Sequence, residues 1–361
     1  MDDDMILRTG FAFLGWFALS ATAAPLDALL TANSPSGAGD NWFEISYDAV
    51  NSTLDVFRIR ESDPIYGGTT VGDYTGLHLR GGVGLFDNLW VEGGLWQRKI
   101  AYRDDHESLR SAQVSMQYRF FGTRDSRSSY ALRASSWVNS TSTLNKTTPT
   151  SLQGFTLDSI DVIEPSDHQL QLDLLGSWKP TRQTEISAFI GKGSSRVKVK
   201  DLTAIMTVAG CRYALAFEPN LVSGTLASSC SDPYTLESFS VTTNSNVVDR
   251  LSYTASYAQF GGMIEWHNAV WQVRGGYQYQ KLHRDKVDDQ IIALGGTPYT
   301  KNHIFVADVS RKIASKAAVF LRGQYMSNQF VGEIPFVYNS FTASRFDRRY
   351  GLVSFGVRFG F

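Results

Sequence analysis

The last twelve residues of the chain, YGLVSFGVRFGF at positions 350–361, alternate between two kinds of side chain. One set of alternate positions is wholly apolar: Val353, Phe355, Val357, Phe359 and Phe361. The other set carries mostly small or polar groups: Leu352, Ser354, Gly356, Arg358 and Gly360. Because successive side chains of a β-strand point to opposite faces, the pattern predicts a strand with one apolar face. That face needs an apolar environment, and the rest of the chain indicates which one.

The same alternation recurs along most of the chain from about residue 50. In AQVSMQYRF at 112–120, every second side chain is apolar and most of the others are polar. Comparable segments cover residues 75–86, 89–102, 130–139, 168–178, 185–197, 251–266, 269–281, 303–313 and 318–328. The first strand falls within residues 42–60, which fit either one long bent strand or two short ones. Counting back from Phe361 predicts about 12 strands, with 10 or 14 as the alternatives.

The links between these segments alternate between short and long. Tight links fall at residues 87–88, 122–128, 179–183, 267–268 and 314–316. Longer polar links fall at residues 61–73, 103–107, 140–167, 198–250, 284–301 and 329–350. Antiparallel hairpins with this alternation place every long loop at one end of the sheet. Short periplasmic turns and long extracellular loops are typical of outer-membrane barrels.

The faces opposite the apolar stripes distinguish a membrane barrel from a soluble β-sandwich, which also alternates. These faces carry Gln, Ser, Arg and Gly in strand after strand, and aromatic residues such as Tyr118, Trp178 and Trp266 stand at the ends of the stripes. Aromatic girdles of this kind meet lipid head groups. We therefore predict an all-β fold, a single antiparallel up-and-down transmembrane barrel over residues 41–361.

The N-terminal residues predict export. Arg8, an apolar stretch from Phe11 to Ala21 and the small residues that follow are typical of a signal peptide, residues 1–23, cleaved after Ala23. Residues 24–40 are rich in Ala, Ser, Gly and Pro and are expected to form a flexible lead-in. Beyond the signal peptide, no apolar run is long enough for a transmembrane helix.

These features together resemble bacterial outer-membrane β-barrel proteins. In that class, a last strand with alternating aromatic residues that ends in Phe is similar to the signal read by the outer-membrane assembly machinery. Val353, Phe355, Val357, Phe359 and Phe361 match it. The resemblance implies location in the outer membrane, contact with its lipid and lipopolysaccharide, and delivery through the periplasm. It implies no specific substrate or oligomeric state.

If the apolar stripes face lipid, a set of charged residues faces the lumen. The arginines are Arg80, Arg98, Arg119, Arg133, Arg274, Arg322 and Arg358, and the carboxylates are Glu92, Asp173, Glu185 and Asp308. Since arginines outnumber carboxylates in this set, the lumen is expected to favour anions. The alternative is an interior in which these groups pair with one another and leave no passage.

The longest link, residues 198–250, contains both cysteines of the chain. In an oxidising compartment, Cys211 and Cys230 are expected to form a disulfide. The link itself is interpreted as a lid, a lumen constriction, a surface for an outside partner, or a loop that packs over the barrel mouth. For the channel hypothesis, we expect this loop to limit the opening.

The function predicted from the sequence is a porin-like channel for small polar or anionic solutes. The alternative is a non-conducting barrel whose extracellular loops bind a partner, and a third hypothesis is an interfacial lipid hydrolase. The sequence contains neither Gly-x-Ser-x-Gly nor a His-x-Ser-Asn-Gly run, so we expect no enzyme activity and no catalytic residues. A net charge of −1 without basic clusters argues against a nucleic-acid partner. We expect no cofactor and no metal site.

Overall fold

The structure is a computed structural model of the whole chain. It describes all residues except 1–26, 34–36, 51–72, 103–104, 148, 153–154, 209, 229, 231–235, 243–245, 294, 329–330, 340–342, 344–349 and 361. The predicted signal peptide and the terminal Phe361 lie outside the described residues. They remain predictions.

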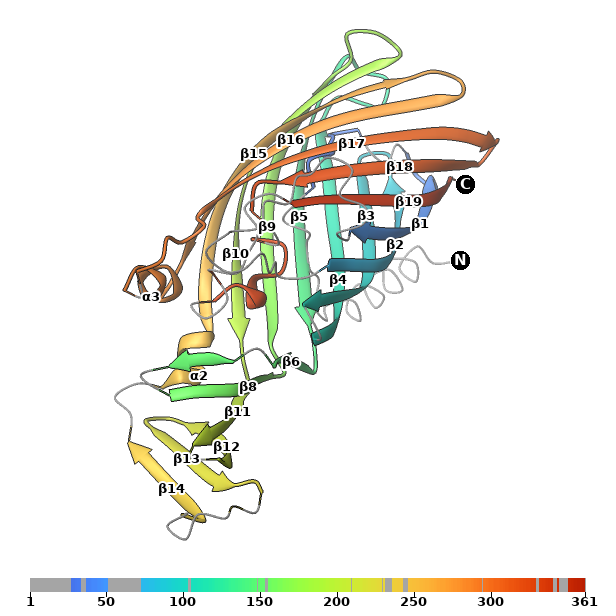
Figure 1. The fold of residues 1–361 in the computed structure, drawn as a ribbon. Coiled ribbons are helices and arrows are strands. Elements are labelled where there is room, and N and C mark those ends of the chain that lie inside the picture. The colour runs from blue at the N-terminus through green and yellow to red at the C-terminus, as the bar shows by residue number, and fades with distance from the viewer. Residues whose placement is uncertain are drawn as a thin grey trace, which may run out of the picture.

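Twelve antiparallel strands close into a barrel, which confirms the predicted fold class and strand count (Figure 1). Around the barrel, the strands follow the order β1-β19-β18-β17-β16-β15-β10-β9-β5-β4-β3-β2. Their bounds are β1 Asn41–Val50, β2 Asp73–Phe86, β3 Leu89–Tyr102, β4 Asp105–Phe121, β5 Ser128–Ser140, β9 Ser166–Trp178, β10 Thr184–Lys198, β15 Tyr253–His267, β16 Trp271–Arg284, β17 Lys301–Ala314, β18 Ala317–Met326 and β19 Tyr350–Gly360.

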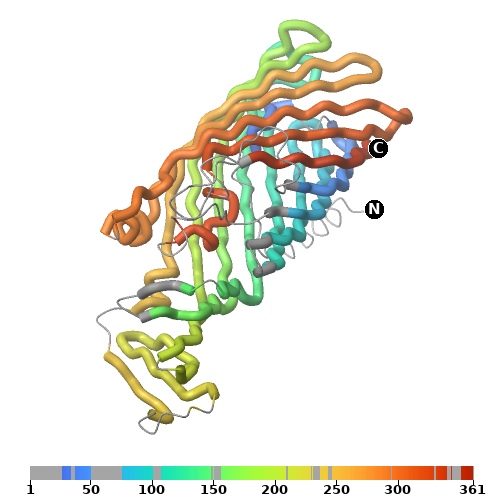
Figure 2. Tube along the Cα trace, viewed as in Figure 1, coloured from blue at the N-terminus to red at the C-terminus, as the bar shows by residue number. Residues whose placement is uncertain are grey.

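The last strand closes the barrel, because β19 pairs with both β18 and β1. Trp42 faces Gly360 and Ala49 faces Val353 in the β1–β19 pair. Closure leaves no sheet edge with unpaired backbone groups, which is the condition for strands to cross a membrane. Figure 2 shows the two ends of the chain's colour range, blue and red, side by side at this seam.

The barrel has two different ends. Five short links, at residues 87–88, 122–127, 179–183, 268–270 and 315–316, all join neighbouring barrel strands at one end, which we call the short-turn end. The longer links leave from the opposite, long-loop end. The predicted alternation of link lengths is therefore confirmed except at one link. Residues 103–107 were expected to be a longer link, but β3 ends at Tyr102 and β4 begins at Asp105, so this link is as short as the turns at the other end.

The outer face of the barrel is apolar over its strands. Alternate side chains of β9 show this: Leu170, Leu172 and Leu174 are exposed, whereas Gln171 and Asp173 are buried inside. Exposed aromatic side chains gather beside the short turns: Phe86, Tyr118, Phe120, Phe121, Tyr130, Trp178, Trp266 and Trp271. An apolar band bordered by aromatic residues is the surface that a bilayer requires.

A second sheet extends from the long-loop end (Figure 1). It consists of β6 Thr143–Lys146, β7 Thr150–Leu152, β8 Phe155–Ile163, β11 Asp201–Val208, β12 Cys211–Glu218, β13 Leu221–Leu226 and β14 Ser238–Thr242. Its apolar face buries Leu202, Tyr213, Leu215 and Phe217. The strands β11 to β14, which lie within residues 198–250, therefore form because alternate apolar side chains build a small core of their own.

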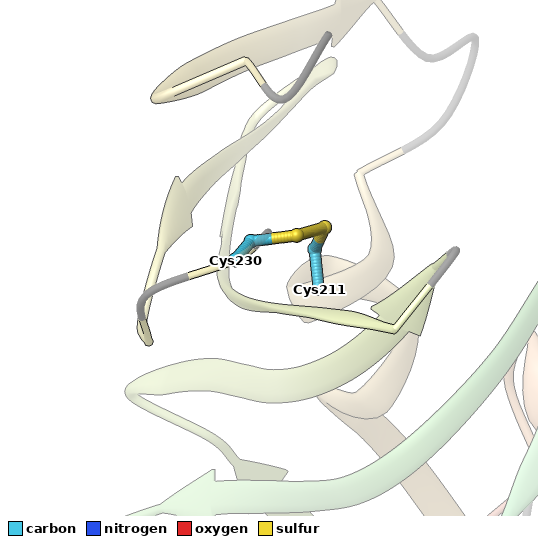
Figure 3. The surroundings of a disulfide bond; sticks show 2 residues. All are labelled: Cys211 and Cys230. Carbon is cyan, nitrogen blue, oxygen red and sulfur yellow. A yellow bond between two sulfur atoms is a disulfide. The ribbon is translucent and has the colours of Figure 1, made fainter. Parts of the chain in front are cut away.

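The disulfide between Cys211 and Cys230 lies in this second sheet, at the start of β12 (Figure 3). The prediction of the pairing is confirmed. Two short helices, α2 Val247–Leu251 and α3 Val287–Ala293, belong to the long-loop end. Among the described residues, no helix combines the length and the apolar character that crossing a membrane would need.

Candidate functional site: the barrel lumen

The charged residues singled out in the sequence all lie on barrel strands, and most are buried. Arg98, Arg119, Arg133, Asp173 and Asp308 are each at most 5% exposed. The structure brings most of the arginines together with carboxylates, so the side chains form ion pairs rather than a row of free cations. No group of three or more His, Cys, Asp or Glu side chains suited to a metal occurs among the described residues.

One network joins five charges on five neighbouring strands, β1, β19, β18, β17 and β16. Glu44 on β1 faces Arg80 on β2 and Arg358 on β19, and Asp308 on β17 faces Arg274 and Arg322. The Glu44 carboxylate lies 2.7 Å from Arg358 and 3.3 Å from Arg322. The Asp308 carboxylate lies 2.9 Å from Arg274 and 3.0 Å from Arg322. These bonds hold the three guanidinium groups in place, because both carboxylates are nearly inaccessible to solvent.

The remaining predicted arginines have separate partners. Arg133 pairs with Glu92 at 3.0 Å, and Arg80 lies 3.5 Å from Asp27. Arg98 pairs at 2.8 Å with Glu333, and its guanidinium also lies over Trp137. Two predicted lumen residues instead belong to the short-turn end. Arg119 donates to the Asp87 carbonyl oxygen, and Glu185 accepts from Thr31.

A central cavity of about 290 Å³ lies among these pairs. The described residues that line it include six arginines, Arg80, Arg98, Arg133, Arg274, Arg322 and Arg358, and six carboxylates, Asp27, Glu44, Asp48, Glu92, Glu265 and Glu333. The sequence-based set contained an excess of arginine because it lacked five of these carboxylates. The lining of the central cavity is instead balanced in charge.

An outer segment, residues 331–338, folds into the half of the lumen nearer the long-loop end. Val331, Ile334 and Phe336 are at most 3% exposed and pack among barrel residues such as Ile304 and Met326. Polar groups hold its backbone at intervals: Asn302 donates to the Val331 carbonyl oxygen at 2.9 Å, and the Tyr253 hydroxyl donates to that of Pro335 at 2.6 Å. The segment includes the 3₁₀-helix Pro335–Val337.

An inner segment, residues 27–33, fills part of the half nearer the short-turn end. It belongs to the predicted lead-in, residues 24–40. The Ala32 backbone N–H donates to the Ser177 hydroxyl at 2.9 Å, and Gln117 donates to the Thr31 carbonyl oxygen at 2.8 Å. The Asn33 carboxamide oxygen accepts from Ser129 at 2.7 Å. Gly276 permits the approach, because a Cβ there would collide with the Ala28 carbonyl oxygen.

The lumen is therefore occupied by two segments, and the expected constriction has a different source. We predicted that the link at residues 198–250 limits the opening. This prediction is wrong for its described residues, which form the second sheet beyond the barrel end. The outer segment, from the link between β18 and β19, lies in the lumen instead. It does so because its apolar side chains pack against apolar residues of the barrel wall near the long-loop end.

A serine, a histidine and an aspartate also meet in the lumen, so the hydrolase hypothesis needs examination. The Ser46 hydroxyl lies 2.8 Å from Nε2 and 3.0 Å from Nδ1 of His78. His78 Nδ1 contacts Asp48 at 2.9 Å, and Nε2 faces Glu44 at 3.4 Å. The Ser46 hydroxyl is nearly equidistant from the two ring nitrogens, and each nitrogen also faces a carboxylate, so neither nitrogen is directed at the serine as the base of a triad is. The group therefore does not form a catalytic triad.

Sequence reasoning missed several lumen residues, and some of them had a detectable signal. Residues 42–48 alternate strictly, with Phe43, Ile45 and Tyr47 exposed and Glu44 and Asp48 buried. This register predicts inward carboxylates once the segment is read as one straight strand. Glu333, by contrast, follows no periodic pattern, and only the folded link places it beside Arg98.

No protein-family model matches this sequence, and no curated protein matches it. Solved structures do match in fold. The β-domain of the Bordetella autotransporter BrkA is 11% identical with a TM-score of 0.43, and the match covers 90% of this chain and 100% of that one. The translocator domain of autotransporter NalP from Neisseria meningitidis is 9% identical with a TM-score of 0.44, covering 91% and 90%.

A third match is the CymD monoaromatic hydrocarbon channel, 10% identical with a TM-score of 0.42, covering 96% of this chain and 99% of that one. These proteins are bacterial outer-membrane β-barrels, and the chain resembles that class in its barrel fold. Similarity at this level is limited to the fold and carries no argument about what the protein transports or binds.

Proposed function

We propose that the protein is an outer-membrane channel for small polar solutes that the outer segment closes in this conformation. The observation that carries the proposal is the central cavity, a charged space inside a barrel whose outer surface is apolar. A barrel of 12 strands is intermediate between those filled by side chains and the wide porins. Here, two segments outside the barrel strands, rather than the wall itself, occupy much of the interior.

The predicted orientation places the short-turn end in the periplasm and the second sheet outside the cell. In that orientation, the outer segment separates the central cavity from the exterior. Its ends are links rather than barrel strands, so it can leave the lumen without breaking the hydrogen bonds between strands. The expected preference for anions stays a prediction, and the balanced charge of the central cavity adds no support for it.

Solute uptake into proteoliposomes tests the channel proposal. The wild-type protein should give slow swelling in a small neutral sugar. A variant in which residues 331–338 are replaced by a Gly/Ser linker of equal length should give much faster swelling. A control variant with the same linker in the second sheet, at residues 219–226, should behave as wild type. Impermeable vesicles with the first variant, folded and inserted, would rule out a channel.

The second sheet favours a second candidate function, binding of an outside partner. It has its own apolar core and a disulfide, and it extends beyond the barrel end. Deleting residues 200–249 separates the two functions. Loss of cell-surface binding with unchanged solute uptake would assign the sheet to a partner. Loss of uptake would assign it to the channel.

A further inference from the structure

A second cavity of about 340 Å³ lies at the short-turn end, and we call it the vestibule. The link between β15 and β16, the link between β17 and β18, and the end of β19 line it. Its lining includes Lys312, Lys316 and Ala318. The vestibule and the central cavity share two lining residues, Gln272 on β16 and Arg358 on β19.

These two shared residues contact each other inside the barrel, although β17 and β18 separate their strands. The Arg358 guanidinium donates to the Gln272 carboxamide oxygen at 3.4 Å. The same oxygen accepts from the Ser310 hydroxyl at 3.3 Å. The two side chains therefore stand between the central cavity and the vestibule and divide one space into two.

The two partners are held with very different strength. Arg358 makes charge-assisted bonds of 2.7 and 3.0 Å to Glu44, and its guanidinium lies over the buried Phe320 ring. Among the described residues, the Gln272 side chain makes two long contacts, at 3.3 and 3.4 Å, which are close to the limit for hydrogen bonds. The Arg358 side chain is thus held in place, whereas the Gln272 side chain can change its conformation at a small cost in free energy.

The inner segment lies at the opposite wall of the lumen at this level, hydrogen-bonded to Gln117, Ser129 and Ser177 on β4, β5 and β9. A solute leaving the central cavity toward the short-turn end with the inner segment in place would therefore move along β16 and β19.

We propose that Gln272 and Arg358 form an inner constriction through which small polar solutes pass between the central cavity and the vestibule. The inference rests on the proposed channel function and adds the route and its narrowest pair of side chains. The carboxamide and guanidinium offer an acceptor and donors to a passing solute, so they can replace its water contacts.

Thiol labelling of the full chain in detergent micelles tests this route. The two native cysteines form a disulfide, so an engineered cysteine is the one free thiol. Ser354→Cys places it in the central cavity, and Ala318→Cys places it in the vestibule. A charged methanethiosulfonate reagent measures access to each position.

Gln272→Ala should increase the labelling rate at position 354 severalfold, because it removes the bridge to Arg358. Gln272→Glu should decrease that rate, because a carboxylate binds the guanidinium more tightly. Labelling at position 318 should be the same in all three backgrounds. This control separates a change at the constriction from a general loosening of the barrel.

Equal labelling rates at position 354 with Gln, Ala and Glu at position 272 would overturn the constriction. The same conclusion would follow if only the Gly/Ser replacement of residues 331–338 changed the rate. In that case the proposed channel would stand, with its access from the long-loop end. Failure of the channel itself would show separately, as impermeable proteoliposomes.

Discussion

The two halves of the lumen are occupied by segments that rest on different interactions. The inner segment combines hydrogen bonds with Gln117, Ser129 and Ser177 of the barrel wall and the burial of smaller apolar side chains, Ala28, Leu30 and Ala32. The outer segment is held mainly by apolar packing of Val331, Ile334 and Phe336. Apolar burial contributes more per side chain than a net hydrogen bond does. The outer segment should therefore form the tighter closure.

The charge network between the two segments should contribute more to the stability of the barrel than to the docking of either segment. Glu44→Gln leaves Arg322 and Arg358 with one fewer buried carboxylate, which should cost about 3–5 kcal/mol of unfolding free energy. Urea unfolding of the refolded barrel measures this loss. Glu265→Gln serves as the control, because among the described residues Glu265 forms an ion pair with the half-exposed His267 rather than with a buried arginine. A loss of equal size in both variants would contradict the assigned role of the network.

Phe336→Ala should loosen the outer segment most among single substitutions there. Removing a buried aromatic side chain costs about 3 kcal/mol or more, which corresponds to roughly a hundredfold in the opening equilibrium. Hydrogen exchange at residues 331–338 should accelerate accordingly, while exchange at residues 27–33 stays unchanged. Acceleration in both segments would mean that the two closures are coupled, contrary to the comparison.

Asn33→Ala should have a smaller effect on the inner segment. The Asn33 oxygen accepts bonds from Ser129 and Arg119, and their loss should cost about 1–2 kcal/mol. Exchange at the Ala32 amide reports the change. Asn145→Ala, in the second sheet, is the matched control and should leave that amide unaffected. If Asn33→Ala accelerated exchange in the inner segment more than Phe336→Ala accelerates exchange in the outer segment, the predicted order of the two closures would be reversed.

Acid should loosen the inner segment slightly. Burial raises the pKa of Asp27, but the guanidinium groups of Arg80 and Arg133 outweigh it and hold the pKa below its ordinary value of 3.8. The docked segment therefore binds this proton less readily than the released one does. Its extra stability is present above pH 3.8 and decreases as the pH falls through the lowered pKa. Asp27→Asn should abolish this dependence in exchange measurements, and a dependence that persists would place its origin elsewhere.

The sequence predicts the barrel well because its evidence is periodic. Alternation in segments such as 112–120, together with alternate link lengths, determines the number of strands and which side chains face outward or into the lumen. The occupants of the lumen are harder to predict, since Glu333 and Asp27 reach it through links without periodicity. The second sheet was missed because its strands, such as CRYALAFE at 211–218, lie within a link first interpreted as one long loop.

The terminal strand gains a clearer meaning from the structure. Phe355 is 60% exposed on the outer face, whereas Ser354 and Arg358 line the central cavity. The last strand thus contributes both to the lipid-facing band and to the proposed solute route. Its predicted role as an assembly signal stays a prediction, because Phe361 lies outside the described residues.

Planar-bilayer recording of two replacement variants tests the central claim most directly. One variant carries a Gly/Ser linker in place of residues 331–338, and the other carries one in place of residues 27–33. Since the outer segment is the closure and the inner segment only narrows the lumen, the first variant should show a large increase in conductance and the second little change. Equal increases, or an increase in the second variant alone, would contradict this account.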